Sequence, residues 1–119
     1  MHQRGSAVVE FALVVPLVLA LVLGVVEVAL VARSQLMVSN AAREGAREAA
    51  ANPNPAGAVA AARAVLGDRG ASTRVSVQRP TIVGKAARVH VVMPYRVAAP
   101  FFGGLSVQLS ATAAMRVER

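Results

Sequence analysis

Residues 5–32 read GSAVVEFALVVPLVLALVLGVVEVALVA, and this stretch decides the fold. Its only charged residues are Glu10 and Glu27. As a helix, the part from Phe11 to Ala32 would be about 33 Å long, which is enough to cross the hydrocarbon core of a bilayer. A chain of 119 residues cannot bury so long an apolar run in a soluble core. We therefore predict a transmembrane segment over residues 6–32.

The helical pattern continues past this segment. Small and apolar residues recur there at the spacing of one helix face, namely Val38, Ala41, Ala42, Gly45, Ala46 and Ala49. A face of small residues allows another element to approach the helix closely, so we expect it to pack against the rest of the domain or against a neighbouring subunit. Pro53 and Pro55 predict that the helix ends near Asn52. One helix should therefore run from Ser6 to Ala51.

The rest of the chain predicts a short helix followed by strands. Asn54 and Pro55 form a cap and first-turn pair for a helix over residues 56–66, which Gly67 would close. Apolar and polar residues then alternate around residues 75–77, 89–91 and 105–117, a period typical of half-buried strands. We predict an α+β fold for residues 33–119, with a small antiparallel β-sheet packed on the C-terminal half of the long helix.

The composition argues against catalysis. The chain has no cysteine, and neither of its two histidines, His2 and His90, lies near a cluster of carboxylates. We therefore predict no catalytic residue, metal site, cofactor or small-molecule substrate. The net charge of +7 could face anionic lipid, a cell-wall polymer or nucleic acid. Solvated arginines are the simpler interpretation, because no aromatic platform for nucleic acid accompanies them.

The N-terminal segment Gly5-Ser6-Ala7-Val8-Val9-Glu10-Phe11 resembles the prepilin cleavage site of type IV pilins and pseudopilins. In that family a membrane-embedded aspartyl peptidase cuts after the glycine, so the resemblance implies a leader of residues 1–5 and a mature N-terminus at Ser6. It also implies that Glu10 pairs with the new amine of a neighbouring subunit or of its own chain, with Phe11 as the aromatic residue of the motif. Alternatively, headgroups solvate Glu10 and the helix dipole favours it.

The run from residue 5 to residue 50 is similar to the TadE-like family, pseudopilins of the tight adherence (Flp, type IVc) pilus system. The similarity rests on Val9-Glu10-Phe11, an early Pro16, a late Glu27 and the segment from Asn40 to Arg47. It implies a minor pilin or pseudopilin that acts in pilus assembly, priming or adhesion. The implied partners are a prepilin peptidase, other pilin subunits, the inner-membrane pilus platform and membrane lipid.

The resemblance also implies a topology. The N-terminus would be cytoplasmic, the helix would cross the inner membrane once, and the C-terminal domain would be extracytoplasmic or part of an extracellular pilus. This orientation follows from the resemblance alone, since the basic residues flanking the span do not favour it.

Other interpretations remain open at this stage. Pro16 either kinks the helix or is a tolerated membrane proline. Glu27 either snorkels to the outer surface or pairs with Arg33 or a base of a partner protein. A competing function is a signal-anchored single-pass protein whose basic domain binds an anionic polymer or DNA. An exported soluble protein is disfavoured, because the apolar run is too long for a signal peptide and lacks a small-x-small cleavage site.

Overall fold

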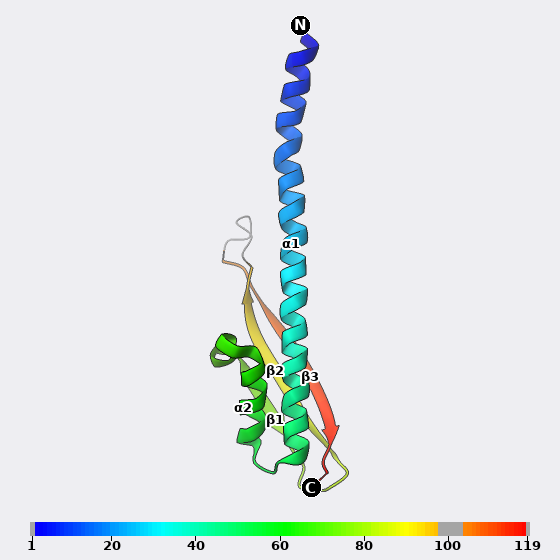
Figure 1. Ribbon diagram of the computed structural model, residues 1–119, viewed down its shortest axis with the longest axis vertical. Helices are drawn as coiled ribbons and strands as arrows, with labels where there is room; N and C mark the ends of the chain where they lie inside the picture. The colour runs from blue at the N-terminus through cyan, green and yellow to red at the C-terminus, as the bar shows by residue number, and fades with distance from the viewer. Residues whose placement is uncertain (1, 98–103, 119) are drawn as a thin grey trace.

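The computed structural model describes residues 2–97 and 104–118. It measures 82 × 23 × 17 Å. Figure 1 shows why it is so elongated: the N-terminal half of one long helix projects alone, and all other elements gather around its C-terminal half. We call the projecting part, residues 3–26, the stalk.

Helix α1 (His2–Ala51) has 50 residues. It ends where Pro53 and Pro55 predict, but it begins four residues before the predicted start at Ser6. The reason is local, since residues 2–4 contain no helix breaker and a single glycine at position 5 costs only about 1 kcal/mol in a helix. The helix also continues through Pro16 without interruption, and the predicted kink there stays a prediction.

Helix α2 (Pro55–Leu66) begins and ends as its sequence predicts. The side-chain oxygen of Asn54 accepts a hydrogen bond of 3.0 Å from the backbone N–H of Ala56. At the other end Gly67 adopts a φ of 58°, which costs a glycine little. A 3₁₀ helix, η1 (Gly67–Ser72), then turns the chain into the sheet.

Strands β1 (Arg74–Gln78), β2 (Ala86–Arg96) and β3 (Ser106–Arg116) form an antiparallel sheet in the order β1-β2-β3. Val91 in the central strand pairs with Val75 on one side and Ala111 on the other. The odd-numbered residues of all three strands therefore share the face toward the helices, as the alternation predicts. The predicted α+β fold is confirmed.

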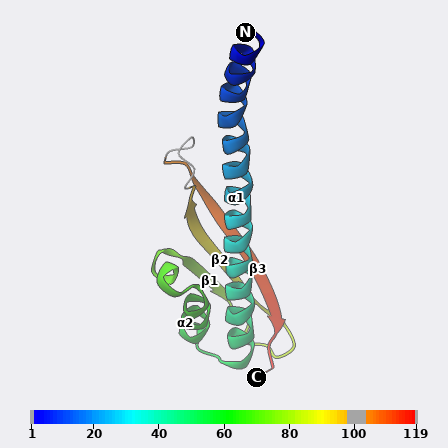
Figure 2. The same ribbon diagram turned by 45° about the horizontal axis from the view of Figure 1, so that its top comes forward.

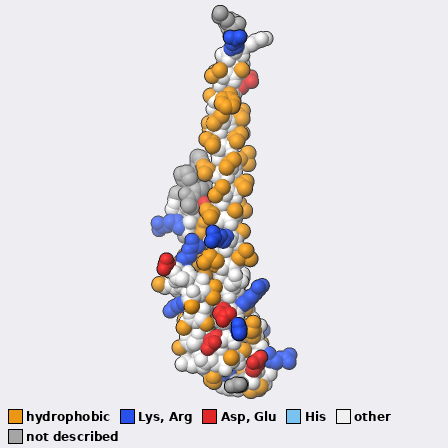
Figure 3. Space-filling model, in the orientation of Figure 1, with side chains coloured by type: hydrophobic (Ala, Val, Ile, Leu, Met, Phe, Trp, Pro, Cys, Tyr) orange, Lys and Arg blue, Asp and Glu red, His pale blue; other side chains and the backbone are white. Residues whose placement is uncertain are grey.

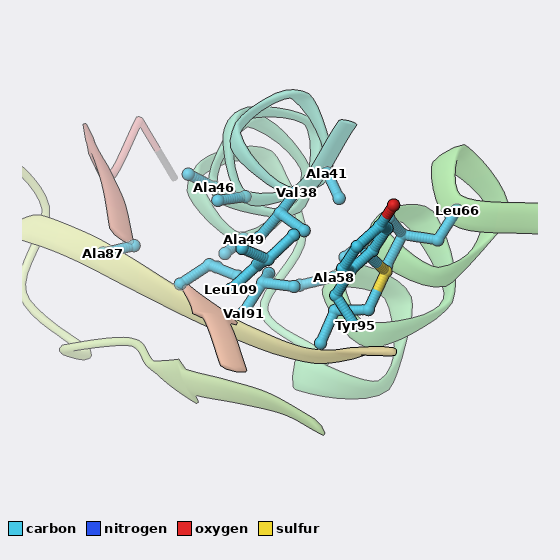
Figure 4. Close-up of a cluster of buried hydrophobic side chains, with 14 of the residues drawn as sticks. Val38, Ala41, Ala46, Ala49, Ala58, Leu66, Ala87, Val91, Tyr95 and Leu109 are labelled. Atoms are coloured by element: carbon cyan, nitrogen blue, oxygen red, sulfur yellow. The ribbon is translucent and has the colours of Figure 1, made fainter. Parts of the chain in front are cut away.

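The core lies between the sheet and the two helices. Helix α1 contacts β2 and β3, whereas α2 lies beside α1 and contacts β1 (Figure 2). The side chains that meet there are mostly small and β-branched (Figure 4). The close approach is tightest at Gly45, where an added Cβ would lie 3.0 Å from Val89 Cγ1 and 3.3 Å from the Ala58 carbonyl oxygen. All six residues of the small-residue face are buried by the chain's own domain, and these are Val38, Ala41, Ala42, Gly45, Ala46 and Ala49.

No described element of the domain covers the stalk in this way. Among the described residues one helix, Gln3–Ala51, is long and apolar enough to cross a membrane, and none of its most apolar window is buried. Figure 3 shows the stalk covered by hydrophobic side chains, with charged side chains concentrated on the domain. An apolar surface of this length needs lipid or other protein around it.

Candidate functional site

The peptide bond between Gly5 and Ser6 lies inside the first turns of α1. Gly5 is exposed, and a Cβ added to it would meet nothing within 4 Å. Among the described residues, therefore, only the helix itself limits access to this bond. Cutting it requires local unwinding, which costs little at the frayed end of a helix.

One turn further along, Ser6 and Glu10 lie on the same face of α1. The hydroxyl of Ser6 donates a hydrogen bond of 3.4 Å to Oε1 of Glu10, and both residues are exposed. Residues four apart are neighbours on a helix surface, so a charged group at Ser6 can interact with this carboxylate. Phe11 follows with 71% of its surface exposed. The structure thus places the three motif residues together at the far end of the stalk.

A shallow apolar groove runs along the middle of the stalk. It is lined by Leu17, Ala20, Leu21, Gly24, Val25 and Val28. The lining includes Ala20 and Gly24, two small residues four positions apart, which is the spacing that lets membrane helices approach closely. This pair is absent from the residues predicted above, although its small-xxx-small spacing is visible in the sequence.

A hydrogen bond at Glu27 joins α1 to the domain. The hydroxyl of Tyr95, at the end of β2, donates a hydrogen bond of 3.4 Å to Oε1 of Glu27. Tyr95 is only 8% exposed. Burial, and then the charge and hydrogen bond of Glu27, raise the pKa of Tyr95 above its usual value of 10.0, whereas the charge of Arg69 opposes this shift. For Glu27 the sequence predicts snorkelling or pairing with Arg33 or a base of a partner protein, and it does not predict the contact with Tyr95.

His90 has a structural partner on the outer face of the sheet. Its Nδ1 lies 2.6 Å from the hydroxyl oxygen of Thr112 on the paired strand. In the described parts of the chain, no group of three or more histidine and acidic side chains is arranged to hold a metal ion.

Comparison with known proteins gives one match. The family model described as TadE-like protein matches residues 5–47, a little over a third of the chain. The match includes the Gly5-Ser6 bond, Glu10, the stalk and most of the buried small-residue face, and it confirms the resemblance identified in the sequence. No curated protein and no solved structure matches the chain.

Proposed function

Because residues 5–47 are TadE-like, we propose that the chain is a minor pilin or pseudopilin of a tight adherence (Flp, type IVc) pilus. It is inserted by its stalk, cut between Gly5 and Ser6 by a prepilin peptidase, and used in pilus assembly, priming or adhesion. Its further partners are other pilin subunits and the inner-membrane platform. The N-terminus is cytoplasmic and the domain is extracytoplasmic.

The observation that carries this proposal is the bare stalk. The described elements of the domain pack around the C-terminal half of α1, and the apolar window of the stalk is unburied (Figure 1). The matched family segment covers this stalk, and the cleavage motif lies at its free end. Such an arrangement fits a subunit that is anchored first in lipid and then packs by its helix against other helices.

Glu10 has a defined role in this proposal. A carboxylate in a membrane helix costs about 2.5 to 3.5 kcal/mol at the helix centre and less toward the ends, unless it gains a partner. The hydrogen bond between Ser6 and Glu10 supports a pairing in which the amine released at Ser6 becomes that partner. In an assembled filament the same carboxylate could take the amine of the next subunit, which would set the stagger between subunits.

The experiment that tests the proposal is identification of the mature N-terminus. The chain is expressed with and without a functional prepilin peptidase, and its intact mass and N-terminal peptide are measured. We expect Ser6 at the N-terminus only when the peptidase is present. If Met1 remains in the presence of active peptidase, the pilin function is wrong.

A second function is favoured by the outer face of the sheet. The even-numbered residues of the strands that point away from the helices include Arg74, Arg88, Arg116 and His90 but no aspartate or glutamate. An acid-free basic face supports a signal-anchored protein that binds an anionic polymer or DNA. Binding of the detergent-solubilised chain to immobilised heparin tests this function. We expect the native chain to be retained and an Arg74→Gln/Arg88→Gln/Arg116→Gln variant to lose this retention.

A further inference from the structure

Three arginines gather where the stalk meets the domain. A pocket there is lined by Leu30 and Ser34 of α1, by Arg33 of the same helix, by Asp68 and Arg69 of η1, and by Arg96 at the end of β2. We call it the junction pocket. Figure 3 shows Lys and Arg side chains together at this level, directly beside the apolar surface of the stalk. We propose that the junction pocket binds the phosphate of an anionic phospholipid headgroup.

The depth of the pocket fits a headgroup. About 20 residues from Ala7 to Val26 form about 30 Å of helix, which matches the thickness of the hydrocarbon core. Glu27 then lies at the outer edge of the hydrocarbon core, where the hydroxyl of Tyr95 in the domain donates its hydrogen bond to Glu27. Arg33 follows about 9 Å further along the helix, and side chains on a helix lean toward its N-terminus. The guanidinium of Arg33 therefore reaches the headgroup layer, which is about 5 to 8 Å thick on each side.

The chemistry of the pocket fits a phosphate. Arginine presents several N–H donors in a planar fork that matches phosphate oxygens, and three arginines outweigh the single carboxylate of Asp68. Arg69 is held in place by a buried residue. Its Nη1 donates a hydrogen bond of 3.0 Å to the hydroxyl of Ser34, which is only 4% exposed. This contact orients Arg69 before any ligand arrives, which lowers the entropy cost of binding.

The pocket also has an apolar side that a free anion would not use. Leu30, Met37 and Leu66 line it together with the arginines. A phospholipid can place its phosphate against the arginines and its glycerol and upper acyl carbons against this side. Inorganic phosphate shares the phosphate chemistry but leaves the apolar side uncovered, so we assign the pocket to the lipid.

This inference rests on the proposed membrane anchoring, and the test separates the two. The full chain is reconstituted into vesicles and extracted with alkaline carbonate. If the carbonate releases the chain, both the anchor and the junction pocket are wrong. If the chain stays in the bilayer, the second measurement decides on the pocket alone.

That second measurement uses spin-labelled lipids in nanodiscs that contain the full chain. The fraction of immobilised label is compared between phosphatidylglycerol and phosphatidylcholine, and the ratio gives the selectivity. We expect the native chain to select phosphatidylglycerol. The variant Arg33→Gln/Arg96→Gln keeps the Ser34–Arg69 hydrogen bond, and its selectivity should fall by about fivefold for each arginine removed. Adding Arg69→Gln should remove most of the remainder.

The matched control removes the same charge elsewhere. The variant Arg74→Gln/Arg88→Gln changes two arginines on the outer face of the sheet and should keep the full selectivity. Equal losses in both double variants would mean that net charge alone attracts the lipid, and would overturn the proposal. So would the absence of any preference for phosphatidylglycerol.

If inorganic phosphate abolishes the preference at an ionic strength at which chloride does not, the pocket takes free phosphate and the assignment to lipid is wrong.

Discussion

The Tyr95 hydroxyl and the Glu27 carboxylate, 68 positions apart in the chain, lie within hydrogen-bonding distance at 3.4 Å. This contact joins the tip of β2 to the level of α1 at which the uncovered stalk ends. It lies beside the junction pocket, which Tyr95 also lines. The distance between these two side chains is therefore a measure of how the domain packs on the helix.

The titration of Tyr95 gives a direct test of this contact. It is the only tyrosine, and the chain has no tryptophan, so tyrosinate absorbance near 295 nm reports this residue alone. We expect its pKa to lie above 10.0 in the folded chain. Glu27→Gln should move the pKa down toward 10.0 without reaching it, because burial is the largest cause of the shift and remains. Glu44→Gln, an exposed site elsewhere on α1, should leave it unchanged.

The same shift predicts how stability depends on pH. Folding favours the neutral phenol, so the contribution is fully present below pH 10 and is lost as the pH rises through the folded pKa. Urea unfolding of the chain in detergent, followed by circular dichroism above pH 10, should show a free energy of unfolding that falls with pH. Tyr95→Phe should flatten this slope. An equal slope in both proteins would contradict the prediction.

Substitution of Gly5 should separate processing from folding. Because a Cβ at this position meets nothing within 4 Å, we expect Gly5→Val to leave the circular dichroism spectrum and the melting temperature unchanged. Cleavage should nevertheless stop, because a branched side chain would crowd the scissile carbonyl. Cleavage is read from the N-terminal peptide by mass spectrometry. Continued cleavage of the variant would show that the peptidase does not select glycine here.

Glu10→Ala should affect assembly more than cleavage. The variant keeps Gly5 and the helix, so we expect Ser6 still to become the N-terminus. It loses the carboxylate that would pair with the released amine, so incorporation into sheared pili should fall to background. The amount of chain in the pilus fraction, measured against total membrane chain, checks this. Glu44→Ala provides a matched loss of one acid and should assemble normally.

Gly45→Val should destabilise the domain. The new side chain would press on Val89 and Ala62 at a junction where even a Cβ lies 3.0 and 3.2 Å from its neighbours. Overpacking of this kind costs about 1 to 3 kcal/mol, which urea unfolding in detergent can measure. Gly24→Val adds the same side chain to an open position of the same helix and should change the free energy of unfolding far less. Similar losses in both variants would show that the close contacts at Gly45 do not cause the destabilisation.

The sequence predicted the elements well where local chemistry determines them. Pro53 ends α1, the side chain of Asn54 caps α2, and Gly67 closes it. The change from a helical period to alternation located all three strands. These signals succeed because each depends on residues within a few positions of one another.

The sequence could not predict contacts that depend on how the elements pack. Ser34 and Arg69 are 35 positions apart, and no local pattern pairs them or brings Tyr95 to Glu27. The alternation in β3 was right, but it predicted burial of Val107 and Met115, which remain 41% and 38% exposed. They lie near the two ends of the strand, whereas Leu109 is buried beneath α1.

The apolar surface of the stalk needs a cover both before and after assembly. No part of the described domain covers it, so at each stage some other apolar surface must do so. Passage from a bilayer into a filament would then be an exchange of neighbours around an already folded subunit, since the core between α1, α2 and the sheet does not involve the stalk. The free energy of that step would be the difference between two solvation free energies of the same helix, one in lipid and one among the helices of the filament.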